Sequence, residues 1–325
     1  MTQQTYTIWQ GEEYAYPMAA GFVPFLTAYT HTGTALRPAM LVVPGGGYCF
    51  VSPTEAEPVA KVFYQAGYNA FVLTYTVNPL MNAPLKTQAL QDISRAVRFI
   101  RARAGAFAID PGRLAVCGFS AGGHLCASLA VHWAGACDPD SAYAGISNRP
   151  DAALLCYPVI TSGSFANRPS FEALLGKDAP AEELAYMSLE NHVSENTPPC
   201  FLWQTMEDDC VPVENSYLFA QALQAKGVPY AHHVFTKGAH GLSVANADWL
   251  AGNVGEPYTK TQLAALRDLC QAGQLPGVEP DAMDHFFAPP GAQDPAWRAA
   301  VENACRQVDI WPQLAIRWLD DMMDI

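Results

Sequence analysis

Short apolar runs alternate with amphipathic segments along most of the chain, and this alternation predicts its secondary structure. The first continuous run, Ala-Met-Leu-Val-Val at residues 39–43, is typical of a strand buried on both faces of a parallel sheet. Two segments of partial alternation, residues 4–9 and 22–30, predict edge strands that enter the fold. Further apolar runs predict strands at residues 69–75, 113–117, 152–157, 200–205 and 230–235.

Between these runs, apolar residues recur at helical spacing. Ser-Pro-Thr-Glu at residues 52–55 has the pattern of a capping box with proline at the first helical position, so a helix is predicted to begin there. Other helices are predicted at residues 86–104, directly after the strand at 113–117, and at residues 214–226 and 306–323. Strands alternating with helices predict an α/β protein with an open, doubly wound, mostly parallel sheet.

Two stretches depart from the alternation. Residues 161–197 are rich in Ser, Pro, Asn and Glu, and residues 246–303 include the turn-forming runs 253–257 and 288–291. The helix that completes the alternation follows only after the second stretch. We therefore interpret residues 1–325 as a single domain in which both stretches cover one end of the sheet, the second of them as a cap-like insertion.

Composition and charge narrow the classes of function. The 325 residues are half hydrophobic and carry 31 acidic against 18 basic side chains, a net charge of −13, with no basic run. Nucleic acid and anionic membranes are therefore poor partners. Residues 1–6 lack the charged and apolar parts of a secretory signal, and no apolar run reaches the 18 residues of a membrane span, so we expect a cytoplasmic protein.

The nine cysteines show no paired spacing. Several of them, Cys117, Cys126, Cys156 and Cys200, fall within predicted strands and helices. This placement is typical of small buried apolar residues, not of zinc ligands or disulfides. No metal or other cofactor is predicted.

Residues 118–122 form the motif Gly-x-Ser-x-Gly between a predicted strand and a predicted helix of small residues. This is the context of a nucleophile elbow, a turn so sharp that Cβ atoms two residues on either side of the serine would clash. The turn lifts the Ser120 hydroxyl above the end of the sheet, where the helix N-terminus favours developing negative charge. The alternative is an ordinary glycine-rich turn.

A serine nucleophile needs a general base and an acid that orients the base. On this architecture they follow in the order Ser, Asp or Glu, His, on loops after later strands. His240 lies between glycines in the loop after residues 230–235, and Glu207, Asp208 and Asp209 follow residues 200–205. The residues alone favour His240 as the base and leave the acid open among these three.

The other histidines are weaker candidates. His232 and His233 lie on opposite faces of one predicted strand, which favours structural roles. His124 falls in the helix after the elbow and His285 in the predicted insertion, and either could approach the site. Neither follows a strand in the position where a base is expected.

An acyl-transfer enzyme also needs donors for the oxyanion of its tetrahedral intermediate. Three glycines at residues 45–47 follow the first buried strand, where such a loop belongs, and glycine leaves its backbone N–H groups exposed. Together with the N–H group of Ala121, this loop could form an oxyanion hole.

Five motifs together resemble the α/β-hydrolase esterases known as acetylxylan or carbohydrate acetyl esterases. They are Pro-Gly-Gly-Gly-Tyr at 44–48, Gly-Phe-Ser-Ala-Gly-Gly-His-Leu at 118–125, Cys-Tyr-Pro-Val-Ile at 156–160, Val-Pro-Val-Glu-Asn-Ser at 211–216 and Gly-Ala-His-Gly-Leu at 238–242. The resemblance covers roughly residues 36–245 and the last helix.

The resemblance implies specific roles. It implies Asp208, four residues before the proline of the Val-Pro pair, as the acid of a Ser-His-Asp triad, and Gly46 and Gly47 as oxyanion donors. Two positions depart from the family pattern, because related esterases often have histidine where this chain has Pro44 and Gln204.

The sequence as a whole predicts a serine esterase that removes short acyl groups, acetyl foremost, from a carbohydrate such as a xylo-oligosaccharide. Its partner would be a small-molecule or oligosaccharide ester. A serine peptidase of the oligopeptidase type shares the elbow, but the chain has no room for the β-propeller that such peptidases usually carry. A non-catalytic binding protein on a hydrolase frame is the other alternative. The acyl group, the alcohol and whether the chain forms homo-oligomers stay open.

Overall fold

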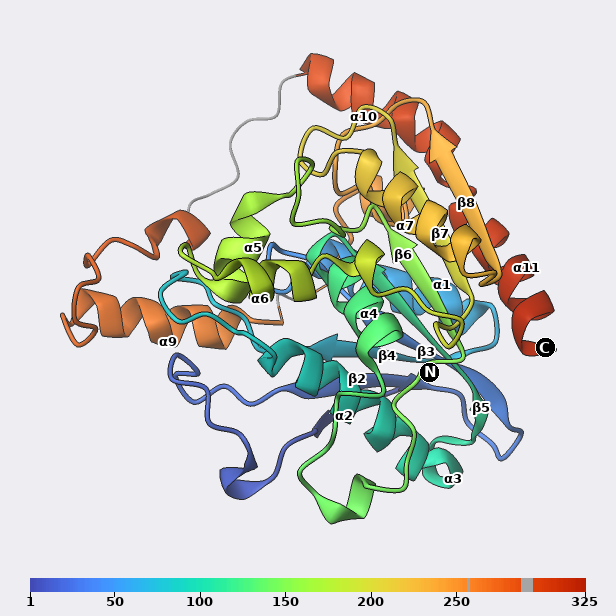
Figure 1. Cartoon of the computed structure of the whole chain (residues 1–325), viewed down its shortest axis with the longest axis horizontal. Coiled ribbons are helices and arrows are strands. Elements are labelled where there is room, and N and C mark those ends of the chain that lie inside the picture. Colours follow the sequence, from blue (N-terminus) through green and yellow to red (C-terminus); the bar gives the residue numbers. More distant parts are fainter. Residues whose placement is uncertain (256–257, 288–294) are drawn as a thin grey trace.

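The computed structural model describes residues 1–255, 258–287 and 295–325. Within the predicted insertion, residues 256–257 and 288–291 of the two turn-forming runs therefore lie outside the described residues. The described residues form one eight-stranded sheet, drawn at the centre of Figure 1. Its strands are β1 (Thr2–Thr7), β2 (Phe25–Thr30), β3 (Arg37–Val43), β4 (Asn69–Thr74), β5 (Ile109–Phe119), β6 (Ala152–Cys156), β7 (Cys200–Thr205) and β8 (Tyr230–Phe235).

The sheet is mixed but mostly parallel. Its strand order is β1-β2-β4-β3-β5-β6-β7-β8, with β1 and β2 antiparallel to their neighbours and every pair from β4 to β8 parallel. This arrangement is the α/β-hydrolase fold that the sequence predicted. One detail of the prediction is wrong: β2 pairs with β1 and β4, so it is not an edge strand.

Helices cover both faces of the sheet (Figure 1). Those in the described residues are α1 (Glu57–Gln65), α2 (Gln88–Ala102), α3 (Ala104–Phe107), α4 (Ala121–His132), α5 (Arg168–Leu175), α6 (Ala181–Tyr186), α7 (Glu214–Ala225), α8 (Ala247–Leu250), α9 (Lys260–Gln271), α10 (Pro295–Val308) and α11 (Trp311–Met323). None of them, within these described ranges, has the length and apolar character needed to span a bilayer.

The buried strand β3 shows how the two faces are filled. Leu41 and Val43 join the core under α2, α4 and α7, whereas Met40 and Val42 join the core under α1, α10 and α11. All four side chains are fully buried, as the continuous apolar run at residues 39–43 predicted. The hydrophobic effect therefore holds the sheet from both sides and fixes the positions of its strand ends.

Two helix predictions are wrong in their local detail. The Ser52 side chain caps no helix; residues 53–55 form a short 3₁₀ helix, and α1 begins only at Glu57. The predicted helix at 306–323 is two helices, because the chain turns between Val308 and Trp311 and the indole of Trp311 packs face to face on that of Trp203 in β7.

The two stretches predicted to interrupt the alternation contain helices of their own. Residues 161–197 hold α5 and α6, and residues 246–303 hold α8, α9 and most of α10. In Figure 1, α9 lies on the opposite side of the molecule from α11. The interpretation of residues 1–325 as a single domain, and of the second stretch as a cap, stays a prediction.

Candidate active site

The sharp turn after β5 is the structural centre of the site. Ser120 has φ 52° and ψ −119°, a backbone conformation that non-glycine residues rarely adopt, and it lies directly before α4. A methyl group on Gly118 would lie 2.2 Å from the carbonyl oxygen of Gly122, and one on Gly122 would lie 2.1 Å from that of Val43. Only glycine fits at either position, which confirms the predicted elbow geometry.

The loops after β7 and β8 bring an acid and a histidine to this serine. His240 Nε2 lies 2.8 Å from Ser120 Oγ, and His240 Nδ1 lies 2.8 Å from Asp208 Oδ2. Because parallel strands end at the same edge of a sheet, residues 120, 208 and 240 meet there despite their separation in the chain. The structure thus brings together the three side chains that the sequence singled out.

The acid is held by backbone groups of its own loop. Asp208 Oδ1 accepts hydrogen bonds from the N–H groups of Cys210, at 3.0 Å, and of Val211, at 2.8 Å. The side chain of Asp208 is almost fully buried, whereas its neighbour Asp209 is exposed. The geometry therefore distinguishes Asp208 from Asp209, which spacing alone could not do.

Gln204 occupies a position where related esterases often have histidine. Its Nε2 donates to the carbonyl of Val211 at 2.6 Å and also reaches Asp208 Oδ2 at 3.4 Å. The glutamine side chain thus ties the end of β7 to the loop that carries Asp208, so this departure from the family pattern leaves the loop anchored.

The protonation of His240 follows from these contacts. A carboxylate only accepts hydrogen bonds, so Nδ1 of His240 carries the proton and Nε2 faces Ser120 as an acceptor. Burial lowers the pKa of His240, but the hydrogen bond and charge of Asp208, aided by the negative charges of Glu55 and Asp209, raise it above the ordinary 6.5 overall. The imidazole is therefore a stronger base than a free histidine.

The glycine loop after β3 lies beside the serine. Gly46 has φ 122°, and a methyl group on it would lie 2.2 Å from the carbonyl oxygen of Phe50, so the loop needs glycine there. Among the described residues, the backbone N–H groups of Gly46 and Gly47 form no hydrogen bond, whereas that of Gly45 donates to Glu55 Oε2 at 2.8 Å. As the first residue of α4, Ala121 has no intrahelical partner for its N–H group.

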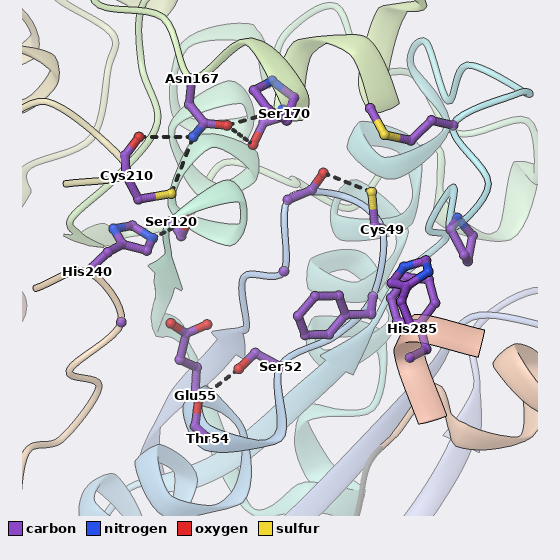
Figure 2. A pocket seen from close by; sticks show the side chains of 18 of the residues that line it. Cys49, Ser52, Thr54, Glu55, Ser120, Asn167, Ser170, Cys210, His240 and His285 are labelled. Atoms are coloured by element: carbon purple, nitrogen blue, oxygen red, sulfur yellow. Dashed lines mark hydrogen bonds between the residues drawn. The ribbon is translucent and has the colours of Figure 1, made fainter. Parts of the chain in front are cut away.

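A cavity of about 740 Å³ opens above these groups. Figure 2 shows Ser120 and His240 on one side of it and His285 across from them. Asn167 and Ser170 of the stretch 161–197 line it, as do Ala282, His285 and Phe286 of the stretch 246–303. Both stretches therefore contribute walls to the cavity.

Apart from His285, which lines the cavity, the weaker histidine candidates do not reach the serine. His124 is buried, its Nδ1 accepting from the Tyr48 hydroxyl at 2.7 Å and its Nε2 donating to the Met187 carbonyl at 3.0 Å. His232 lies 3.1 Å from the Ser216 hydroxyl, and the ring of His233 packs on that of Phe201. The four cysteines predicted to be buried are buried and unpaired.

Sequence reasoning missed one acid at this site. Glu55, assigned above to a helix cap, is buried and lines the cavity with Ser120 and His240. Its position depends on the 3₁₀ turn at residues 53–55, whereas the capping pattern had predicted the start of an α-helix there. A single signal pointed to it: it is the first acidic residue after the glycine loop, eight positions beyond Gly47.

Comparison with known proteins gives consistent matches. The BD-FAE family model matches residues 28–223. Endo-1,4-beta-xylanase B of Butyrivibrio fibrisolvens is 52% identical over 260 residues, covering 80% of this chain and 41% of that protein. Acetylxylan esterase of Xylanibacter ruminicola is 28% identical over 210 residues, covering 63% of this chain and 41% of that protein. The chain thus spans about two fifths of the length of these two curated relatives.

Among solved structures, the chain is similar to the acetyl ester-xyloside bifunctional hydrolase from Caldicellulosiruptor lactoaceticus. The two are 37% identical with a TM-score of 0.70, and the match covers 83% of this chain and 96% of the other. The matched length includes nearly the whole of that protein, so the likeness extends beyond the elbow motif to the fold that carries it.

Proposed function

The chain belongs to the BD-FAE family of α/β-hydrolase esterases, and from this we propose that it is a serine esterase that removes short acyl groups, acetyl foremost, from a carbohydrate. The observation that carries the proposal is the hydrogen-bonded chain from Ser120 through His240 to Asp208, at the mouth of a cavity and above a strained elbow. These are the parts that acyl transfer by an activated serine needs.

In the proposed reaction, Ser120 Oγ attacks the ester carbonyl carbon while its proton passes to His240 Nε2. Asp208 holds the imidazole by its Nδ1 proton and stabilises the imidazolium that forms. Collapse of the tetrahedral intermediate breaks the bond to the alcohol oxygen, which takes the proton from Nε2 and leaves. Water then attacks the acyl-serine by the same steps, releasing the acid and restoring Ser120.

We assign the oxyanion to the N–H groups of Gly46, Gly47 and Ala121. The first two are unpaired among the described residues, and Ala121 begins α4, so its N–H is supplemented by the positive end of the helix. Donors that are already in place lower the barrier because they need no reorganisation as charge develops. One such donor contributes roughly 10²–10³-fold in rate in other serine hydrolases.

Two features support a small acyl group and a larger alcohol. Next to Ser170, the side chains of Tyr48, His124, Phe171 and Leu174 surround a crevice too narrow for a water molecule. The cavity on the other side of Ser170 has a volume typical of sites that bind ligands of drug size, which is large enough for a sugar ring. We place the acyl group in the cavity beside Ser170, where the closed crevice leaves no room for a longer chain, and the alcohol in the rest of the cavity.

The names of the relatives support a carbohydrate alcohol. One similar protein is an acetylxylan esterase, another an endo-1,4-beta-xylanase, and the similar solved structure is an acetyl ester-xyloside hydrolase. We therefore infer an acetylated xylo-oligosaccharide as the substrate class. The cytoplasmic location and the formation of homo-oligomers stay predictions.

Acetate release tests this function. The wild-type protein should liberate acetate from acetylated xylo-oligosaccharides and cleave p-nitrophenyl acetate and butyrate but not long-chain p-nitrophenyl esters. Ser120→Ala, which leaves the backbone intact, should lose nearly all of this activity. Cleavage of aminoacyl-nitroanilides without esterase activity would instead indicate a peptidase, and failure of folded protein to react with a fluorophosphonate would indicate a binding protein.

A further inference from the structure

Glu55 is a buried acid at the floor of the cavity with no role in the reaction described so far. Its exposed fraction is 4%, yet it lines the same cavity as Ser120 and His240. In Figure 2 its carboxylate points from the 3₁₀ turn at residues 53–55 toward the side of the cavity that holds these two residues. A buried carboxylate is costly unless something compensates for its lost hydration.

The two carboxylate oxygens bind two different catalytic loops. Oε2 accepts from the backbone N–H group of Gly45, at 2.8 Å, in the glycine loop. Oε1 accepts from the hydroxyl of Tyr157 at 2.7 Å, and that hydroxyl in turn accepts from the N–H group of Ser243, at 3.1 Å, in the loop of His240. One side chain therefore connects the predicted oxyanion donors to the predicted base.

The contacts are close to the reacting groups. A methyl group placed on Gly45 would lie 2.9 Å from both Glu55 Oε2 and Ser120 Cβ, so the carboxylate and the serine pack against the same glycine. The ring of Tyr157 packs edge-on against the imidazole of His240, with centroids 4.9 Å apart. A substitution of Glu55 should therefore disturb the positions of both Ser120 and His240.

Strained backbone marks the same network. Tyr157 has φ 37° and Ser243 has φ 48°, both in the left-handed region, which is unfavourable for non-glycine residues. Both residues are buried, and both are held by the hydrogen bonds just described. Such strain persists only where surrounding contacts fix the conformation, so the hydrogen bonds to Tyr157 and Ser243 hold these two residues in place.

The charges of the network are mutually favourable. The groups that face His240 are Asp208, Asp209 and Glu55, all acidic; those that face Glu55 are His240 and the hydroxyls of Tyr75 and Tyr157. Burial raises the pKa of Glu55 above its ordinary value, and the hydrogen bonds from Tyr157 and Gly45 and a positive charge on His240 offset this rise only in part. Proton transfer to His240 therefore favours the ionised form of Glu55.

We propose that Glu55 is a positioning residue for acyl transfer, which holds the glycine loop and the His240 loop in register through Gly45 and Tyr157 and stabilises the imidazolium with its charge. This inference rests on the proposed function only in taking Ser120 and His240 as the reacting pair. It adds a second buried acid to the site, on a different loop from Asp208.

The pH dependence of kcat/KM for p-nitrophenyl acetate tests the proposal. Glu55→Gln keeps the shape and removes the charge, so the acid limb should move to lower pH, and kcat should fall by about tenfold or more. Tyr157→Phe removes the link and keeps the charge, so it should lower kcat while leaving the acid limb in place. Glu57→Gln, two residues on and paired with Lys61 on the surface of α1, is the matched control and should change neither.

An acid limb that stays at the wild-type pH in Glu55→Gln, with kcat within threefold of wild type, would overturn the proposal. Should Glu55→Gln fail to fold, Tyr157→Phe decides, because wild-type kcat in that variant would exclude the proposed link. The rate at which a fluorophosphonate labels Ser120 provides the same pH profile without any ester. A wild-type protein that reacts with this probe but hydrolyses no ester would refute the proposed function alone.

Discussion

The substitution Asp208→Asn gives a prediction whose outcome is fixed by hydrogen-bond geometry. Asp208 Oδ1 accepts from two backbone N–H groups, those of Cys210 and Val211. An amide NH₂ group cannot replace that oxygen, because it would place donors against donors. The Asn oxygen must therefore occupy the Oδ1 position, and its NH₂ group must face His240 Nδ1, now 2.8 Å from Oδ2.

The consequence is a change of tautomer with little change of structure. Facing a donor, Nδ1 becomes an acceptor and the proton moves to Nε2, the atom that lies 2.8 Å from Ser120 Oγ. Such an imidazole cannot accept the serine proton. By comparison with the corresponding change in another serine hydrolase, we expect kcat to fall by about 10⁴-fold, equivalent to ~5 kcal/mol of activation free energy.

The assay is the hydrolysis of p-nitrophenyl acetate at pH 7, together with thermal unfolding to show that the fold is intact. Asp209→Asn is the matched control. Asp209 is exposed and, in the part of the chain that the structure describes, acts on the imidazole of His240 through its charge alone, so activity should stay within about threefold of wild type. A loss of less than tenfold in Asp208→Asn, or an equal loss in Asp209→Asn, would refute this reasoning.

Three further predictions concern the elbow, the crevice and the base. Gly122→Ala would place a methyl group 2.1 Å from the Val43 carbonyl and should lower the unfolding free energy by about 1–3 kcal/mol in thermal or urea unfolding, whereas Gly145→Ala, with no atom within 4 Å, should not. Phe171→Ala should widen the crevice and raise the butyrate-to-acetate ratio of kcat/KM by about tenfold; an unchanged ratio would place the acyl group elsewhere. Because activity needs neutral His240, whose pKa is raised, kcat/KM should fall as pH drops, with a midpoint above 6.5, and a midpoint below 6.5 would contradict the proposed role of Asp208.

Much of the fold was predictable because its strands are continuous apolar runs. The strands at residues 200–205 and 230–235 match the predicted bounds, and the loops after them carry Asp208 and His240 as expected. The parallel arrangement then brings both side chains to Ser120. The order of these residues along the chain, combined with strand ends that share one edge, was sufficient to predict which groups would meet.

The rest depended on tertiary contacts that local patterns do not encode. Glu55 fits the pattern of a capping box, but burial against Gly45 and Tyr157 determines its position instead. Helix α9 has an apolar stripe that packs on Phe50 and Leu80 beside the cavity, but turn-forming residues around it concealed the helix in the sequence. In both cases the partner lies far away in the chain, so spacing alone could not reveal the contact.

The central claim is that Ser120 carries the acyl group during hydrolysis, and mass spectrometry of the intermediate tests it most directly. The wild-type protein would be mixed with an acetylated xylo-oligosaccharide, quenched in acid within the first turnovers, digested and mapped. We predict one acetyl group on the peptide that contains Ser120, and none in Ser120→Ala. Acetate release at the wild-type rate by Ser120→Ala, or an acetyl group trapped on another residue, would contradict the account.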